Sequence, residues 1–189
     1  MKSLIIFAHP GTKGHCCSIL DEVLNFHDSN NIKYDLIDLY KIKYDPVLKP
    51  EEHYTAGNRK ITKQNKEFQN KISHTQNFIF IFPVWWGSMP AILKGFIDRV
   101  FTGRFAFTFN KHGFPIKLLK GNSIVFMTSG GPNFFYWFYN PARAIIKKVI
   151  LQFCGIKTKV YQVGNAKKFT DKNIGIIKKT VQKALSRFY

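Results

Sequence analysis

The sequence has few cysteines and no long apolar segment. Its 189 residues include three cysteines, of which Cys16 and Cys17 are neighbours and therefore poorly placed for a mutual disulfide. This usage indicates a reduced, intracellular protein, and the Cys-x-x-Cys redox spacing is absent. No stretch approaches the ~20 apolar residues that cross a bilayer. The apolar start at residues 4–8 is too short for a signal peptide, so we expect a cytoplasmic protein.

Acidic residues are scarce. The chain has 11 Asp and Glu against 29 Lys and Arg, a formal charge of +18, and Asp171 is the only acid between residues 142 and 189. Such an excess could attract nucleic acid, anionic lipid or phosphorylated small molecules. The basic residues are interspersed with apolar ones rather than packed in one block, which favours a solvated surface. No nucleic-acid motif is present, so no specific nucleic-acid partner is expected. A peripheral contact with a membrane or a transporter stays open.

Several catalytic motifs are also missing. The chain has neither a Gly-x-x-x-x-Gly-Lys-Ser/Thr loop nor a Gly-x-Ser-x-Gly elbow. The first absence argues against a Walker A nucleotide site, and the second leaves hydrolase chemistry unsupported. The histidines are scattered and the cysteines lack metal-ligand spacing, so no metal site is expected.

The sequence does contain an alternation of strands and helices. Apolar runs predict five strands, and the segments between them include helical patterns. Five such strands imply a parallel sheet covered on both faces, and right-handed crossovers favour a flavodoxin-like three-layer α/β sandwich in strand order 2-1-3-4-5. We expect one domain over residues 1–189. The predicted strands are residues 3–8, 34–39, 77–82, 123–128 and 158–163, and the predicted helices are residues 16–26, 58–73, about 90–101, 142–154 and about 170 onward.

In this topology a ligand binds at the loops that follow the first, third and fourth strands. Those loops are residues 9–15, 83–89 and 129–135. The first contains Gly11 and Gly14 ahead of a helix start, a pattern that fits a phosphate site and a plain structural turn about equally well.

The second loop is aromatic. The strand should stop at Pro83, and a helix should start with Ser88 as its N-cap and Pro90 near its first position. Between them, Trp85 and Trp86 are costly to expose. We expect them to face a flat ligand; the alternative is packing in the core or in a subunit interface.

The start of the third loop, together with Thr128 at the end of the strand before it, forms residues 128–131. These residues offer hydroxyl groups and a glycine pair whose main-chain amides can approach the edge of a ligand. Tyr136 follows this loop. Its hydroxyl could donate a proton or a hydrogen bond to a reducing centre, or the ring could simply pack among its neighbours.

These motifs resemble the flavodoxin-like NAD(P)H:quinone oxidoreductases, a family that includes mammalian quinone reductases, bacterial drug-modulator quinone reductases and ancillary subunits of potassium-efflux systems. The resemblance rests on residues 8–10, 82–86, 90–101, 103–107 and 128–131. It implies a homodimer that binds FAD, or less often FMN, and passes a hydride from NAD(P)H through the flavin to a quinone or nitroaromatic acceptor in a ping-pong cycle. The alternative is a flavin- and nucleotide-binding regulator of a potassium-efflux system.

Carried over by position, the resemblance assigns the flavin contacts. The first loop would meet the phosphates, the second the ring system and the third its polar edge, while Tyr136 would be the catalytic residue. Where the mammalian enzymes place a histidine six residues later, this chain has Ala142, so Tyr136 would act alone or with water. The implied cofactor-binding residues are His9, His15, Cys16, Cys17, Pro83, Val84, Trp85, Trp86, Gly87, Thr128, Ser129, Gly130, Gly131 and Tyr136.

Overall fold

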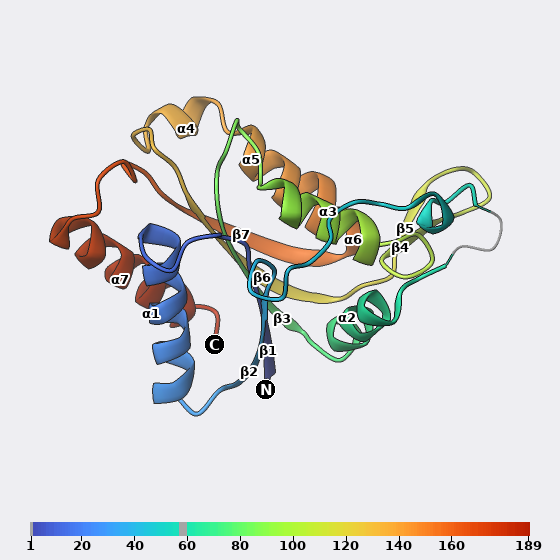
Figure 1. The fold of residues 1–189 in the computed structure, drawn as a ribbon, viewed down its shortest axis with the longest axis horizontal. Coiled ribbons are helices and arrows are strands. Elements are labelled where there is room, and N and C mark those ends of the chain that lie inside the picture. Colours follow the sequence, from blue (N-terminus) through green and yellow to red (C-terminus); the bar gives the residue numbers. More distant parts are fainter. Residues whose placement is uncertain (1, 57–59) are drawn as a thin grey trace.

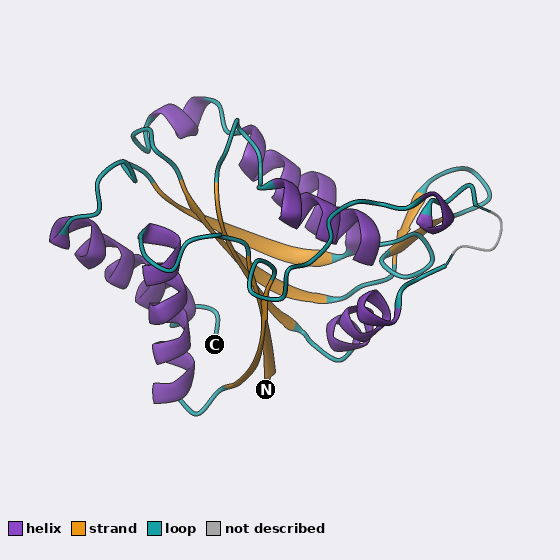
Figure 2. Ribbon diagram, in the orientation of Figure 1, coloured by secondary structure: helices purple, strands orange, loops and turns teal. Residues whose placement is uncertain are grey.

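The computed structural model describes residues 2–56 and 60–189 and contains a five-stranded parallel sheet (Figures 1 and 2). The strand order is β2-β1-β3-β6-β7, and each neighbouring pair is parallel. Counted along the chain, these strands have the predicted order, which is confirmed. The sheet strands are β1 (Lys2–Phe7), β2 (Lys33–Asp38), β3 (Asn77–Pro83), β6 (Gly121–Thr128) and β7 (Ile156–Val163).

Helices cover both faces of the sheet (Figure 1). Helices α1 and α7 pack on one face, and α2, α3 and the α5–η2–α6 segment pack on the other. None of the helices in the described part of the chain is long and apolar enough to span a membrane. The bounds are α1 (His15–Ser29), η1 (Pro50–Glu52), α2 (Lys63–Ser73), α3 (Ala91–Val100), α4 (Phe135–Phe138), α5 (Pro141–Ala144), η2 (Ile145–Leu151), α6 (Gln152–Cys154) and α7 (Asp171–Leu185).

The sheet has one apolar core on each face, because successive side chains of a strand point to opposite faces. In β1, Leu4 and Ile6 join the core under α3, whereas Ile5 belongs to the core under α1 and α7. All seven residues of β3 are buried. Continuous apolar runs of this kind suit central parallel strands, because both faces of such strands are covered by helices.

Two of the predicted helices differ in detail from the structure. The helix predicted from residue 58 begins at Lys63; its predicted first two residues lie outside the described part of the chain. The helix predicted over residues 142–154 is present, but residues 145–151 have π-helical hydrogen bonding, and Gly155 closes the helix in the left-handed conformation. The segment after α3 contains a separate antiparallel hairpin, β4 (Phe107–Phe109) with β5 (Pro115–Lys117).

The strand β3 ends at Pro83 as predicted, but the start of the helix after it differs from the prediction. One further hydrogen bond to β6 follows the end of the strand, because the Val84 N–H donates to the Thr128 carbonyl at 2.7 Å. Alternate N–H groups of a strand point to opposite neighbours, so the donor that Pro83 lacks would have pointed toward β1 instead of β6. Ser88 is not the N-cap of α3; Pro90 occupies that position, and no side chain caps the helix.

A buried ion pair attaches the long connection after β2 to α3. Arg99 donates from Nε and Nη2 to the two carboxylate oxygens of Glu52, at 2.8 and 2.9 Å. The Tyr44 ring lies 5.6 Å from the guanidinium, and both charged side chains are about 95% buried. The connection therefore has a defined path across the helix.

Candidate functional site

The three predicted loops meet at the carboxyl edge of the sheet. Their strands β1, β3 and β6 are adjacent, with Phe7 opposite Ile81 and Pro83 opposite Thr128. Thr128 connects the loops. Its carbonyl accepts from Val84, and its hydroxyl lies 3.2 Å from the Cys16 thiol at the start of α1.

The first loop ends at an uncapped helix start. Gly14 is the N-cap of α1 with φ of +112°, and no side chain caps its first turn. The first N–H groups of a helix have no intrahelical acceptor, so these groups and the helix dipole are available to an anion. Within the loop, the Gly11 N–H donates to His9 Nδ1 at 3.0 Å, and the Cys17 thiol donates to the Gly11 carbonyl at 3.1 Å.

The side chains of His15 and Cys16 are turned into the protein. His15 Nε2 accepts from Asn173 on α7 at 2.9 Å, and burial lowers the pKa of the imidazole, which favours its neutral form. Burial raises the pKa of the Cys16 thiol to about 12, so it stays protonated at neutral pH. At an anion site these two residues therefore offer main-chain N–H groups rather than charge.

The second loop is a tight turn that presents two indole rings. Trp85 and Ser88 exchange both main-chain hydrogen bonds at 2.9 Å. Trp86 and Gly87 have φ of +49° and +71°, as a two-residue type I′ turn requires. The Trp86 side chain is fully exposed and Trp85 is 42% exposed. Neither indole is packed in the protein core, so both remain available to a flat ligand.

The third loop offers a pair of unpartnered donors. The N–H groups of Gly130 and Gly131 have no acceptor among the described residues. A Cβ added at Gly131 would lie 3.3 Å from the Tyr136 hydroxyl, so the phenol stands directly beside this backbone. The Ser129 hydroxyl accepts from Gln162 at 2.9 Å and is already engaged.

A fourth loop, residues 164–170 between β7 and α7, belongs to the same edge and was not predicted. Ala166 donates to the Ser129 carbonyl and Asn165 to the Gly131 carbonyl, both at 2.9 Å. This pairing places the Lys167 side chain next to Gly130, 3.7 Å from the position of an added Cβ. The sequence did contain a signal for this loop. The loop follows β7, and β7 neighbours β6 in the sheet, so both strands end at the same edge.

These groups fit the demands of a flavin. The ring system needs a flat apolar surface, which the exposed indoles supply. Its polar edge needs hydrogen-bond donors, which Gly130 and Gly131 supply without a competing protein acceptor. Its phosphate needs an anion site, which the uncapped start of α1 supplies.

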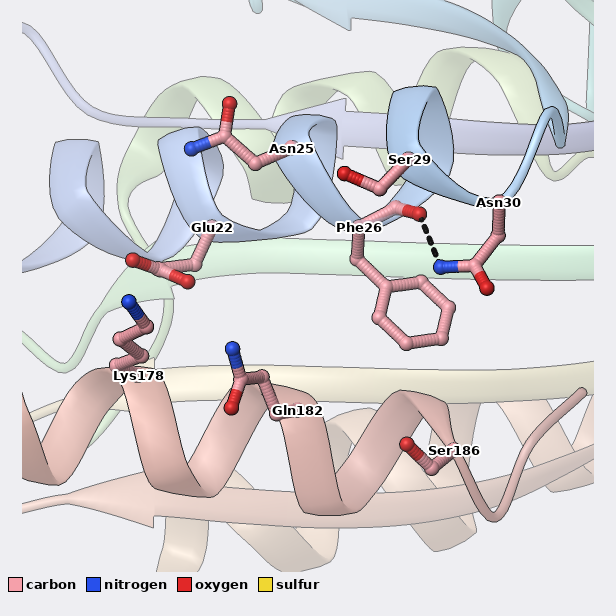
Figure 3. A pocket seen from close by; sticks show the side chains of 8 residues that line it. All are labelled: Glu22, Asn25, Phe26, Ser29, Asn30, Lys178, Gln182 and Ser186. Carbon is pink, nitrogen blue, oxygen red and sulfur yellow. Dashed lines mark hydrogen bonds between the residues drawn. The ribbon is translucent and has the colours of Figure 1, made fainter.

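The hollows away from these loops include a polar groove and a largely apolar pocket. One, of about 420 Å³, is a polar groove between the later turns of α1 and α7, where Glu22 and Lys178 face each other (Figure 3). The other, of about 670 Å³, is largely apolar and lies between α3, β4 and α6, with Phe107 and Phe153 in its wall. Neither contains any of the predicted cofactor-binding residues.

The family model described as "Flavodoxin-like fold" matches residues 1–186. This chain belongs to that family. Its resemblance to the NAD(P)H:quinone oxidoreductases is likewise confirmed by the relatives described next.

Among the curated relatives, a Haemophilus influenzae protein named "Uncharacterized NAD(P)H oxidoreductase" is 32% identical over 69% of this chain and 65% of its own length. A rat protein named "Ribosyldihydronicotinamide dehydrogenase [quinone]" is 29% identical over 86% of this chain and 80% of its own length. The match therefore spans slightly less than two thirds of the first of these relatives.

Solved structures show the same fold. Smu.1420 from Streptococcus mutans has a TM-score of 0.87 at 30% identity, covering 98% of this chain and all of its own. A Bacillus anthracis FMN-dependent NADH-azoreductase in complex with FMN has a TM-score of 0.81 at 21% identity, covering 98% of each chain. At that identity the second likeness concerns the fold alone.

Proposed function

We propose that this protein is a flavin-dependent NAD(P)H oxidoreductase that reduces quinones or related acceptors such as nitroaromatic and azo compounds. The observation that carries the proposal is the third loop: two unpartnered N–H groups beside the Tyr136 hydroxyl. The names of the relatives support the same chemistry.

When bound, a flavin would supply the two-electron chemistry that couples oxidation of NAD(P)H to reduction of the acceptor. The chain's own residues position and tune it. Trp85 and Trp86 would flank the ring and exclude water, and the Gly130 and Gly131 N–H groups would bind its polar edge. Tyr136 would donate a hydrogen bond where negative charge develops on reduction.

We propose FMN rather than FAD as the bound cofactor. The family resemblance had implied FAD, with FMN as the less frequent alternative. The uncapped start of α1 would offer its free N–H groups to one phosphate, and a flavin mononucleotide has one phosphate. A structurally similar azoreductase is described in complex with FMN. The proposal retains the homodimer, because the β4–β5 region exposes large apolar groups, with Phe109 57% and Phe114 68% exposed.

A visible absorption spectrum of the purified protein tests the proposed function. We expect a flavin band, and chromatography of the denatured supernatant should identify FMN. Recovery of FAD would leave the chemistry in place and reverse the choice of cofactor. A colourless protein that also fails to bind added FMN or FAD would refute the proposal.

Tyr136→Phe should lower the rate of NAD(P)H-dependent quinone reduction while leaving flavin bound. A hydrogen bond to a charged group contributes about 1.5–3 kcal/mol, which corresponds to a rate loss of roughly 10- to 100-fold. Stopped-flow measurement of flavin reduction would isolate the step.

Tyr139→Phe is the matched control, because this nearby side chain is 76% exposed and removal of its hydroxyl should leave the rate unchanged. Equal rates for Tyr136→Phe and the unsubstituted protein would remove Tyr136 from the mechanism.

A further inference from the structure

The four loops at the carboxyl edge carry positive charge without any acid. Residues 9–15, 83–89, 129–135 and 164–170 contain no Asp or Glu, but they contain Lys13, Lys167 and Lys168. A cluster of one sign is expected to attract an anion, and the low-dielectric strands behind the loops strengthen this effect. One of these cations, Lys167, lies beside the third loop.

Lys167 belongs to the fourth loop, which lies against the third loop. Its loop is attached to the third loop by the Asn165 and Ala166 N–H groups, and Asn165 turns the chain with φ of +57°. A Cβ at Gly164 would lie 2.7 Å from the Gly131 carbonyl, so only glycine permits this close approach. The two loops thus form one unit.

The Lys167 stem runs alongside Gly130. Its Cγ and Cε would lie 3.7 and 3.9 Å from a Cβ on Gly130, so the methylene chain passes close to the backbone. Within the described part of the chain its ammonium group forms no ion pair. The stem of a lysine without an ion-pair partner therefore lies next to the backbone of Gly130.

We propose that Lys167 stabilises the negative charge that a bound flavin acquires on reduction. This inference rests on the proposed function. A hydride brings one hydrogen and two electrons, so NAD(P)H becomes NAD(P)⁺ and the ring gains one negative charge. An ammonium group beside the polar edge of the ring stabilises that charge and has little effect on the neutral oxidised ring. Lys167 thereby raises the reduction potential of the cofactor.

The test is the midpoint potential of the bound flavin in the holoprotein at low ionic strength, where an exposed charge is screened least. For Lys167→Gln we expect the preference for reduced over oxidised flavin to fall about tenfold, which is about 30 mV for a two-electron couple. Lys167→Arg should restore the potential, since it restores the charge. Lys168→Gln is the control, an exposed lysine of the same loop, and it should leave the potential unchanged.

Several results would overturn the proposed role of Lys167. An unchanged potential in Lys167→Gln overturns it, as does an equal shift in Lys168→Gln, which would indicate a diffuse effect of net charge. If Lys167→Gln loses the same amount of affinity for oxidised and for reduced flavin, Lys167 only anchors the cofactor. This result too overturns the inference. An unsubstituted protein that binds no flavin overturns the proposed function as well, so the two failures are distinguishable.

Discussion

Gly130→Val is expected to abolish flavin binding and to leave the protein folded. A Cβ at this position meets no protein atom closer than 3.7 Å, and the backbone is outside the left-handed region, so valine can be accommodated in the cofactor-free protein. The added methyl groups would occupy space that the ring edge needs beside the Gly130 and Gly131 N–H groups. We expect affinity to fall at least about 100-fold, close to 3 kcal/mol.

Fluorescence titration with FMN would measure this loss, with circular dichroism to verify the fold. Gly175→Val is the matched control, because that glycine also has open space around its Cβ position but lies on the exposed side of α7. A Gly130→Val protein that binds FMN as tightly as this control would contradict the proposed position of the ring.

Arg99→Met should produce the largest loss of stability. Methionine retains much of the stem volume but leaves the Glu52 carboxylate, which is 4% exposed, without its two charged donors. Removing one partner of a buried ion pair costs about 3–5 kcal/mol, a large part of the stability of a domain this size. Urea unfolding followed by circular dichroism would give the change in the free energy of unfolding.

Lys94→Met is the control, because it removes an exposed ion pair with Asp98 from the same helix, at 2.7 Å, and should cost at most about 0.5 kcal/mol. If Arg99→Met costs no more than this control, the buried pair does not stabilise the fold.

The same pair predicts a pH dependence. Burial alone would raise the pKa of Glu52, but hydrogen bonds from Arg99 and its charge outweigh burial and hold the pKa below its ordinary value. A carboxyl group with a lowered folded-state pKa contributes stability above its ordinary pKa and loses it as pH falls through the lowered value. Arg99→Met should therefore unfold at a higher pH than Lys94→Met during acid titration.

The sequence predicted most of the sheet and three loops of the site because both depend on local patterns. Buried parallel strands are continuous apolar runs, as in residues 77–82, and glycine or proline marks where they end. Right-handed crossovers then leave few strand orders, so the loops after β1, β3 and β6 could be assigned to one edge. The family resemblance added the ligand class.

The type I′ turn was not predicted, because a tryptophan with positive φ contradicts the local preference of that residue type. The sequence suggested Ser88 as a helix cap, whereas the structure uses its main chain to close the turn with Trp85. The mutual fit of β3, β6 and α3 overrides local propensity here.

The sequence by itself determined the fold class, the order of the sheet and the place where three loops converge, since hydrophobic periodicity and chain chirality are properties of short segments. Only the tertiary structure decided that His15 and Cys16 turn inward, that Arg99 meets Glu52 across 47 positions, and that Lys167 lies beside Gly130. These contacts join residues far apart in the chain, and their geometry depends on the packing of whole elements. No local pattern encodes that packing.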